Sequence, residues 1–163
     1  MGGQEAAEGP RLTHLDEAGA ALMVDVSAKD VTVRSATATG RVTLSAECVA
    51  LLRGAGVPKG DALAVARVAG IMGAKRTPDL VPLCHPLALS GLTVDLVVED
   101  DGVAVTVTAR TTDRTGVEME ALTAVSVACL TLVDMTKAVD PRSVIGQIRV
   151  ETKTGGKTGS WTR

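Results

Sequence analysis

The chain has 163 residues, a formal net charge of -2 and a hydrophobic content of 45%, so it can bury the core of one domain. Only 1% of its residues are aromatic, and with so few aromatic side chains and no basic excess we expect no nucleic-acid partner. Cys48, Cys84 and Cys129 lie far apart, a spacing that fits neither a disulfide framework nor a paired-cysteine zinc site.

The first predicted elements follow a polar segment rich in Gly and Ala, residues 1–11, which we expect to form a flexible tail. Two segments rich in Val and Thr, 21–27 and 30–45, predict strands. A short helix is expected over residues 46–53, because glycines follow it closely.

A longer helix is predicted to begin after Asp61, whose carboxylate can cap it, and to end at Lys75 and Arg76, whose charges suit a helix C-terminus. The segments LTVDLVVE and VAVTVTAR then alternate in hydrophobicity on either side of Asp100-Asp101-Gly102. This pattern predicts a β-hairpin.

The last third of the chain predicts a long helix over about 116–138, a strand over 144–153 and a mobile Gly-rich loop over 154–163. Helices and strands are thus mixed, and at least one strand pair is antiparallel. The pattern predicts an α+β fold with helices packed on one face of an antiparallel sheet. No repeat or linker divides residues 12–163, which we expect to form one domain.

The N-terminal residues lack the apolar core of a signal peptide, and no later stretch combines the length and lack of charge of a membrane span. We therefore expect a cytoplasmic protein with no membrane partner.

The stretch LVPLCHPLALS, residues 80–90, places one of only two histidines, His85, between two prolines. Pro86 favours an extended backbone at His85, and Pro82 stiffens the approach to it. Such a loop suits a histidine that contacts a substrate, and it equally suits one that only packs. Cys84 has no base beside it in the sequence, which favours a small packed residue over a nucleophile.

The long predicted helix carries carboxylates in different settings. Thr115 and Glu118 fit a T-x-x-E capping box, which would make Glu118 structural. Glu120 and Asp134 lie within about 40° of each other on the helix surface, along a stripe of small or apolar residues that predicts a pocket wall. They are also about 21 Å apart along the axis, so a site that uses both needs a long substrate or helices from two subunits.

Lys137 follows Asp134 by three residues, a spacing that allows an ion pair on one helix face. Two interpretations remain open. The pair is either a surface contact near a helix end, or an acid–base pair in which each group shifts the proton affinity of the other.

Further cations share no obvious partner in the sequence: Arg34, Lys59, Lys75, Lys153 and Lys157. Each alone is most often a solvated charge, but together they can bind the anionic group of a phosphorylated substrate. The glycines in GGKTG, residues 155–159, do not make a P-loop, because the earlier glycine and the following helix of that motif are missing.

Four stretches carry a specific combination of motifs: LTHLDEAGAALMVDVSAK (12–29), KGDALAVARVAGIMGAKRTPDLVPLCHPL (59–87), TGVEMEALTAVSVACLTLVDMTKAV (115–139) and VIGQIRVETKTGGKTG (144–159). They cover over half of the chain, and in this order they resemble the cyclic pyranopterin monophosphate synthases, the family also called molybdenum cofactor biosynthesis protein C. One departure is Arg114, which stands where that family has a lysine and keeps the positive charge.

The resemblance implies a lyase-type enzyme of molybdenum cofactor biosynthesis. Such enzymes rearrange 3′,8-cyclo-7,8-dihydro-GTP to cyclic pyranopterin monophosphate and release pyrophosphate, and the resemblance implies no cofactor and no metal. It also implies a ferredoxin-like fold and a homo-hexamer, built as a trimer of dimers with its sites at subunit interfaces.

The resemblance further implies roles for single residues. Asp134 and Lys137 would form the acid–base centre, with Lys59 as a second catalytic amine. Substrate contacts are implied for Leu83, Cys84, His85, Met119, Glu120, Lys153 and Lys157, with Arg34, Lys75 and Glu118 as further contacts. Two other functions remain open: a non-catalytic module that binds a nucleotide or pterin, and a structural oligomer whose charges only join its subunits.

Overall fold

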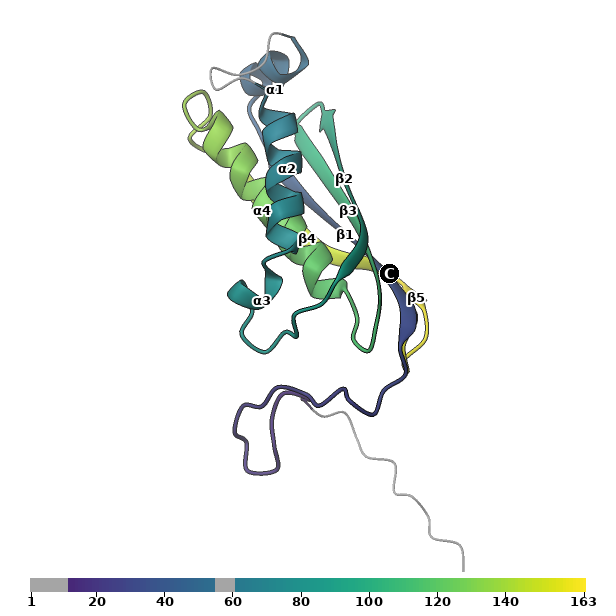
Figure 1. Ribbon diagram of the computed structural model, residues 1–163. Coiled ribbons are helices and arrows are strands. Elements are labelled where there is room, and N and C mark those ends of the chain that lie inside the picture. The colour runs from purple at the N-terminus through teal and green to yellow at the C-terminus, as the bar shows by residue number, and fades with distance from the viewer. Residues whose placement is uncertain (1–11, 55–60) are drawn as a thin grey trace, which may run out of the picture.

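The computed structural model describes residues 12–54 and 61–163, which form one antiparallel sheet with helices on one face (Figure 1). The strands are β1 (Thr32–Thr43), β2 (Leu89–Glu99), β3 (Gly102–Asp113), β4 (Val144–Thr154) and β5 (Trp161–Thr162). The helices are α1 (Ala46–Arg53), α2 (Ala62–Ala74), α3 (Thr77–Leu80) and α4 (Glu118–Thr136). The sheet order β2-β3-β1-β4-β5 confirms the predicted ferredoxin-like α+β fold, with β5 added at one edge.

The core lies between the sheet and the two long helices. The helix α4 packs across β1, β3 and β4, while α2 packs beside it and over β2 (Figure 1). Alternate residues of the central strands, such as Ala38 in β1 and Val105 in β3, face these helices and are fully buried. Because these side chains are small, the helices approach the sheet closely.

Among the described residues, α4 alone has the length and the apolar composition needed to cross a membrane. Most of it is buried inside this fold, against the sheet and α2. A core helix meets the same criteria of length and composition, and that is the position of α4 here.

The predicted strand at 21–27 is wrong. This segment has extended and turn conformations, and its only ladder contact is an isolated bridge between Ala21 and Leu15. Val24 and Val26 alternate with polar residues because both valines line a cavity, and not because they face the core from a strand. The 1–11 tail lies outside the described residues.

The predicted capping box is also wrong. The helix α4 begins at Glu118 after Val117, with no side-chain cap, and Glu118 instead pairs with Lys153 of β4 at 3.0 Å. A single-turn helix, α3, was not predicted either. It begins at Thr77 with Pro78 in its first turn, where the missing N–H of proline costs nothing.

The two strands of the predicted hairpin agree closely with the predicted pattern. β2 and β3 pair around Asp100 and Asp101, and Glu99 lies opposite Gly102. The predicted last strand is β4, and the predicted loop 154–163 contains β5, in which Trp161 lies opposite Lys153. The mobility of this loop stays a prediction.

We expect Gly40→Ala to destabilise the protein by about 1–3 kcal/mol, because the new Cβ would overpack the core. In β1, that Cβ would lie 2.4 Å from Cγ1 of Val125 on α4. Valine in a helix holds one strongly preferred rotamer, so Val125 cannot turn aside.

Urea unfolding of Gly40→Ala beside Gly146→Ala measures this effect. Gly146 lies on the adjacent strand β4, and a Cβ there meets no atom within 4 Å, so Gly146→Ala should leave stability nearly unchanged. Equal stabilities of the two variants would contradict the close packing of α4 on β1.

Candidate active site

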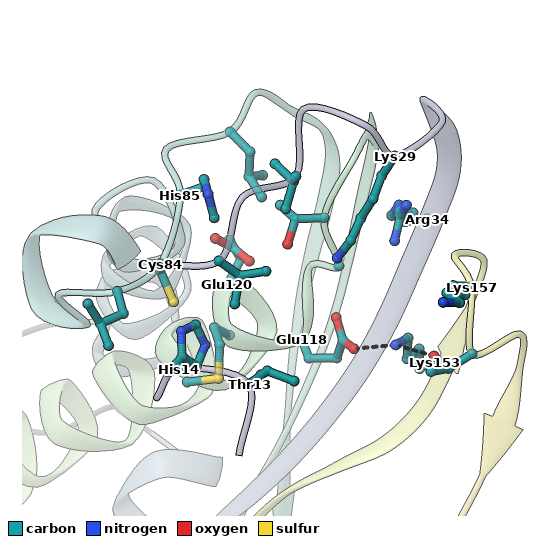
Figure 2. Close-up of a pocket in the computed structure, with 18 residues that line it drawn as sticks. Thr13, His14, Lys29, Arg34, Cys84, His85, Glu118, Glu120, Lys153 and Lys157 are labelled. Carbon is teal, nitrogen blue, oxygen red and sulfur yellow. Dashed lines mark hydrogen bonds and ion pairs between the residues drawn. The ribbon is translucent and has the colours of Figure 1, made fainter. Parts of the chain in front are cut away.

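Four segments meet around a cavity of about 390 Å³: the N-terminal segment, the loop after α3, the start of α4 and the C-terminal loop (Figure 2). Nine residues that the sequence marked line it: Arg34, Leu83, Cys84, His85, Glu118, Met119, Glu120, Lys153 and Lys157. The fold thus gathers residues spread over more than a hundred positions, which is the arrangement of a binding site.

Glu120 is the buried carboxylate of this pocket. It lies in the first turn of α4 with only 3% of its surface exposed. Burial raises the pKa of Glu120 to about 7, and the nearby charge of Glu118 acts in the same direction. A carboxyl group with such a pKa can both give and take a proton at neutral pH, which suits general acid–base catalysis.

Cys84 and His85 lie on the loop that follows α3. The backbone N–H of Cys84 donates to the carbonyl of Val81 at 3.0 Å, which closes a turn and turns the next residues toward the pocket. Burial, and then the Glu120 carboxylate, raise the pKa of the Cys84 thiol. A thiol of raised pKa is a poor nucleophile, in agreement with the interpretation of Cys84 as a packed residue.

His85 also borders a second cavity of about 460 Å³, whose lining includes Val24 and Val26 of the first. Asp25 lines that cavity, and the backbone N–H of Ser27 donates to its carboxylate at 2.8 Å. The Ser27 hydrogen bonds lower the pKa of Asp25, and the charge of His85 contributes in the same direction. His85 therefore lines both cavities, and the Asp25 carboxylate lines the second of them.

Arg34 is a cation built into the floor of the pocket. Its side chain is 7% exposed, and Nε donates to the carbonyl of Asp113 at 2.9 Å. None of the carboxylates in the described part of the chain forms a salt bridge with it. Gly156 packs on its guanidinium, at a φ of +79°, where a Cβ would lie 2.4 Å from Nη1. The glycine is therefore required where the C-terminal loop passes over Arg34.

Lys153 links the same loop to α4. Its Nζ lies 3.0 Å from Oε1 of Glu118 and donates to Oγ1 of Thr158 at 2.9 Å. Lys157 and Lys29 line the same end of the pocket, beside Arg34 (Figure 2). Four cations at one end of a cavity form an anion site of the kind that phosphate groups occupy.

Four residues of the predicted site lie elsewhere or are not described. Asp134 and Lys137 form their predicted ion pair, with Nζ and Oδ1 2.6 Å apart, but each side chain is more than half exposed and neither lines the pocket. The continuous α4 keeps Asp134 about 21 Å from Glu120 along the axis. Lys75 follows α2 on the surface, away from the lining, and Lys59 lies outside the described residues.

Two titratable residues of the pocket were not predicted as site residues, His14 and Lys29. Both belong to the stretch at 12–29 that carries part of the family resemblance, and His14 is the other histidine of the chain. A search for rare residue types would have found His14. Among the described residues, no three His, Cys, Asp or Glu side chains gather as metal ligands.

Comparison with known proteins gives one consistent result. The model of the MoaC family matches residues 23–156. A relative from Streptomyces coelicolor, named cyclic pyranopterin monophosphate synthase, is 72% identical over 94% of this chain and 90% of its own. A relative of the same name from Nocardioides sp. is 70% identical over 94% of this chain and 96% of its own. One from Mycobacterium tuberculosis, named cyclic pyranopterin monophosphate synthase 2, is 62% identical over 93% and 91%.

Proposed function

This chain belongs to the MoaC family, and we propose that it is a cyclic pyranopterin monophosphate synthase of molybdenum cofactor biosynthesis. As a lyase-type enzyme, it rearranges 3′,8-cyclo-7,8-dihydro-GTP to cyclic pyranopterin monophosphate and releases pyrophosphate. The observation that carries the proposal is one pocket in which a buried Glu120 meets a cluster of four cations.

The layout of the pocket suits a triphosphate joined to a purine-derived ring. Arg34 and the lysines offer charge-assisted hydrogen bonds to phosphate oxygens at one end (Figure 2). Glu120 and His85 lie toward the other end, with Leu83 as an apolar contact. Mixed apolar walls with a few convergent polar groups are typical of small-molecule sites.

The chemistry needs several proton transfers, because one ring opens, another closes and a cyclic phosphate forms. Glu120, with a pKa near neutral, is one proton carrier of the pocket. The Asp134–Lys137 pair is a second acid–base centre, and Lys59 is a further catalytic amine. The cations at the far end stabilise the negative charge that grows on the departing pyrophosphate.

The distance between Glu120 and Asp134 favours a shared site. One chain holds them about 21 Å apart on the same straight helix, so we propose that Asp134 and Lys137 of one subunit complete the pocket of another. Exposed apolar side chains on α2 and α4, among them Val68, Met72 and Leu130, offer surface for assembly. The assembly proposed is a homo-hexamer, a trimer of dimers in the cytoplasm.

A coupled assay tests the function. The radical enzyme that cyclises GTP supplies the substrate, and pyrophosphate is measured together with the fluorescent oxidised pterin. We expect both products from the wild type and neither from Lys137→Ala, because the acid–base centre has lost its amine. Product from both proteins would support the synthase function but would show that Lys137 is not needed for the reaction. Bound but unchanged substrate in the wild type would favour a non-catalytic binding module.

A further inference from the structure

His14 belongs to a short hairpin that reaches the pocket from the N-terminal side. Figure 2 shows its ring near Cys84 and Glu120, on the side opposite the cations. Leu22 N donates to the carbonyl of His14 at 3.0 Å, and Leu15 bridges to Ala21, so the strands of the hairpin are held in register.

The turn of this hairpin is held by hydrogen bonds. Oδ1 of Asp16 accepts from the backbone N–H groups of Ala18 at 2.9 Å and of Ala20 at 2.8 Å. Gly19 supplies the left-handed conformation, at a φ of +82°, and its N–H donates to the carbonyl of Asp16 at 3.0 Å. Every residue from 12 to 21, His14 included, is exposed, so this ordered turn does not serve the core.

The ring of His14 has a defined orientation. Its Nδ1 lies 3.3 Å from the carbonyl oxygen of Leu22. A carbonyl oxygen only accepts, so Nδ1 carries the hydrogen and the neutral ring keeps its lone pair on Nε2. His14 therefore offers a hydrogen-bond acceptor to a ligand in the pocket.

The two ends of the pocket differ in what they can recognise. Lys29, Arg34, Lys153 and Lys157 gather at one end and are donors only (Figure 2). The end at His14 adds acceptor atoms, namely Nε2 of His14 and the oxygens of the Glu120 carboxyl group, which can also donate when protonated. A ligand that placed its phosphates on the cations would direct its ring, and the N–H groups of that ring, toward His14.

We propose that His14 is a specificity residue that accepts a hydrogen bond from the nitrogen-rich ring of the substrate and has no part in binding its phosphates. The inference rests on the proposed function, because that function supplies a ligand with a guanine-derived ring at one end and a triphosphate at the other.

Two substitutions separate recognition from packing. His14→Leu keeps much of the volume and removes the acceptor, whereas His14→Gln retains an amide oxygen that can accept. We expect kcat/KM to fall about tenfold in His14→Leu, the effect of one lost hydrogen bond to a buried partner, and much less in His14→Gln. Glu17→Gln, in the exposed turn of the same hairpin and off the pocket lining, is the control and should match the wild type.

Titration of the full-length proteins with GTP and with inorganic tripolyphosphate gives a readout that does not need turnover. Support for the proposal is weaker GTP binding by His14→Leu, with tripolyphosphate binding unchanged and GTP binding largely kept by His14→Gln. The proposal would be overturned if the wild type and the three variants (His14→Leu, His14→Gln and Glu17→Gln) bound GTP with equal affinity. It would also be overturned if GTP binding were too weak to measure in all of them. An equal loss for both ligands would also overturn it, since it would point to a structural role. Failure of the proposed function is seen separately, as a wild type that releases no pyrophosphate.

Discussion

A mixture of two inactive variants should regain activity if each site is shared between subunits. Asp134→Asn removes a carboxylate near one end of α4, and Glu120→Gln removes a carboxylate near the other end. Each change alone is expected to lower kcat by about a hundredfold or more, the usual contribution of a positioned acid or base. In a two-fold interface that joins one variant of each kind, one site carries both defects and the other carries none.

Co-expression of the two variants with different affinity tags, followed by purification over both tags, supplies the mixed assembly. Random pairing predicts that about a quarter of all sites are intact before selection for mixed assemblies. The matched control mixes Asp134→Asn with Lys137→Ala. These two residues are ion-paired in one chain, so both defects fall on the same half of the site and activity should stay low. No recovery in the first mixture would contradict the shared site.

Glu120→Gln is also expected to change the pH dependence of stability. The pKa of Glu120 is raised from its ordinary value of 4.5 to about 7 in the folded protein. Between these values the folded state keeps a proton that the unfolded state has lost, so the free energy of unfolding falls as the pH rises through this window. The stabilisation is fully present below about pH 4.5 and is lost above about pH 7, a difference of about 3 kcal/mol.

Glutamine has nearly the same shape and no charge to bury, so Glu120→Gln should be more stable than the wild type above pH 7 and similar to it near pH 5. Urea unfolding at pH 5 and at pH 8 measures the difference in stability, and the exposed Glu17→Gln is the control. The activity of the wild type should show an apparent pKa near 7 that the variant lacks. A variant that is no more stable at pH 8 would mean that Glu120 is solvated or paired in the folded protein.

The sequence predicted the sheet and the long helices well, because their signals are local. The alternation of the β2–β3 hairpin and the apolar run of α4 each span many residues, and both elements formed. Short sequence patterns that are compatible with more than one local structure predicted it less reliably. Thr115 and Glu118 have the spacing of a capping box, but a lysine more than thirty residues away competes for the same carboxylate.

The site was predictable only in part, for the same reason. A helical wheel puts Glu120 and Asp134 on one stripe, but burial depends on what covers each end of α4. Glu120 is covered by segments from distant parts of the chain, whereas the Asp134 side chain remains 58% exposed. The sequence marked Arg34 as a cation, but its contact with Gly156 joins two residues more than a hundred positions apart. No local pattern encodes such a contact.

The composition of the chain has a practical consequence for spectroscopy. Trp161 is the only Trp in a chain without Tyr or Phe, so the ultraviolet fluorescence of the whole protein arises from a single indole. That indole lies opposite Lys153 in the β4–β5 pair, at the end of the loop that passes over Arg34, and 41% of its surface is exposed. Its emission therefore reports the solvent environment of the C-terminal loop with no competing signal. Whether this loop moves when a ligand binds can be followed in the unlabelled, unmodified enzyme.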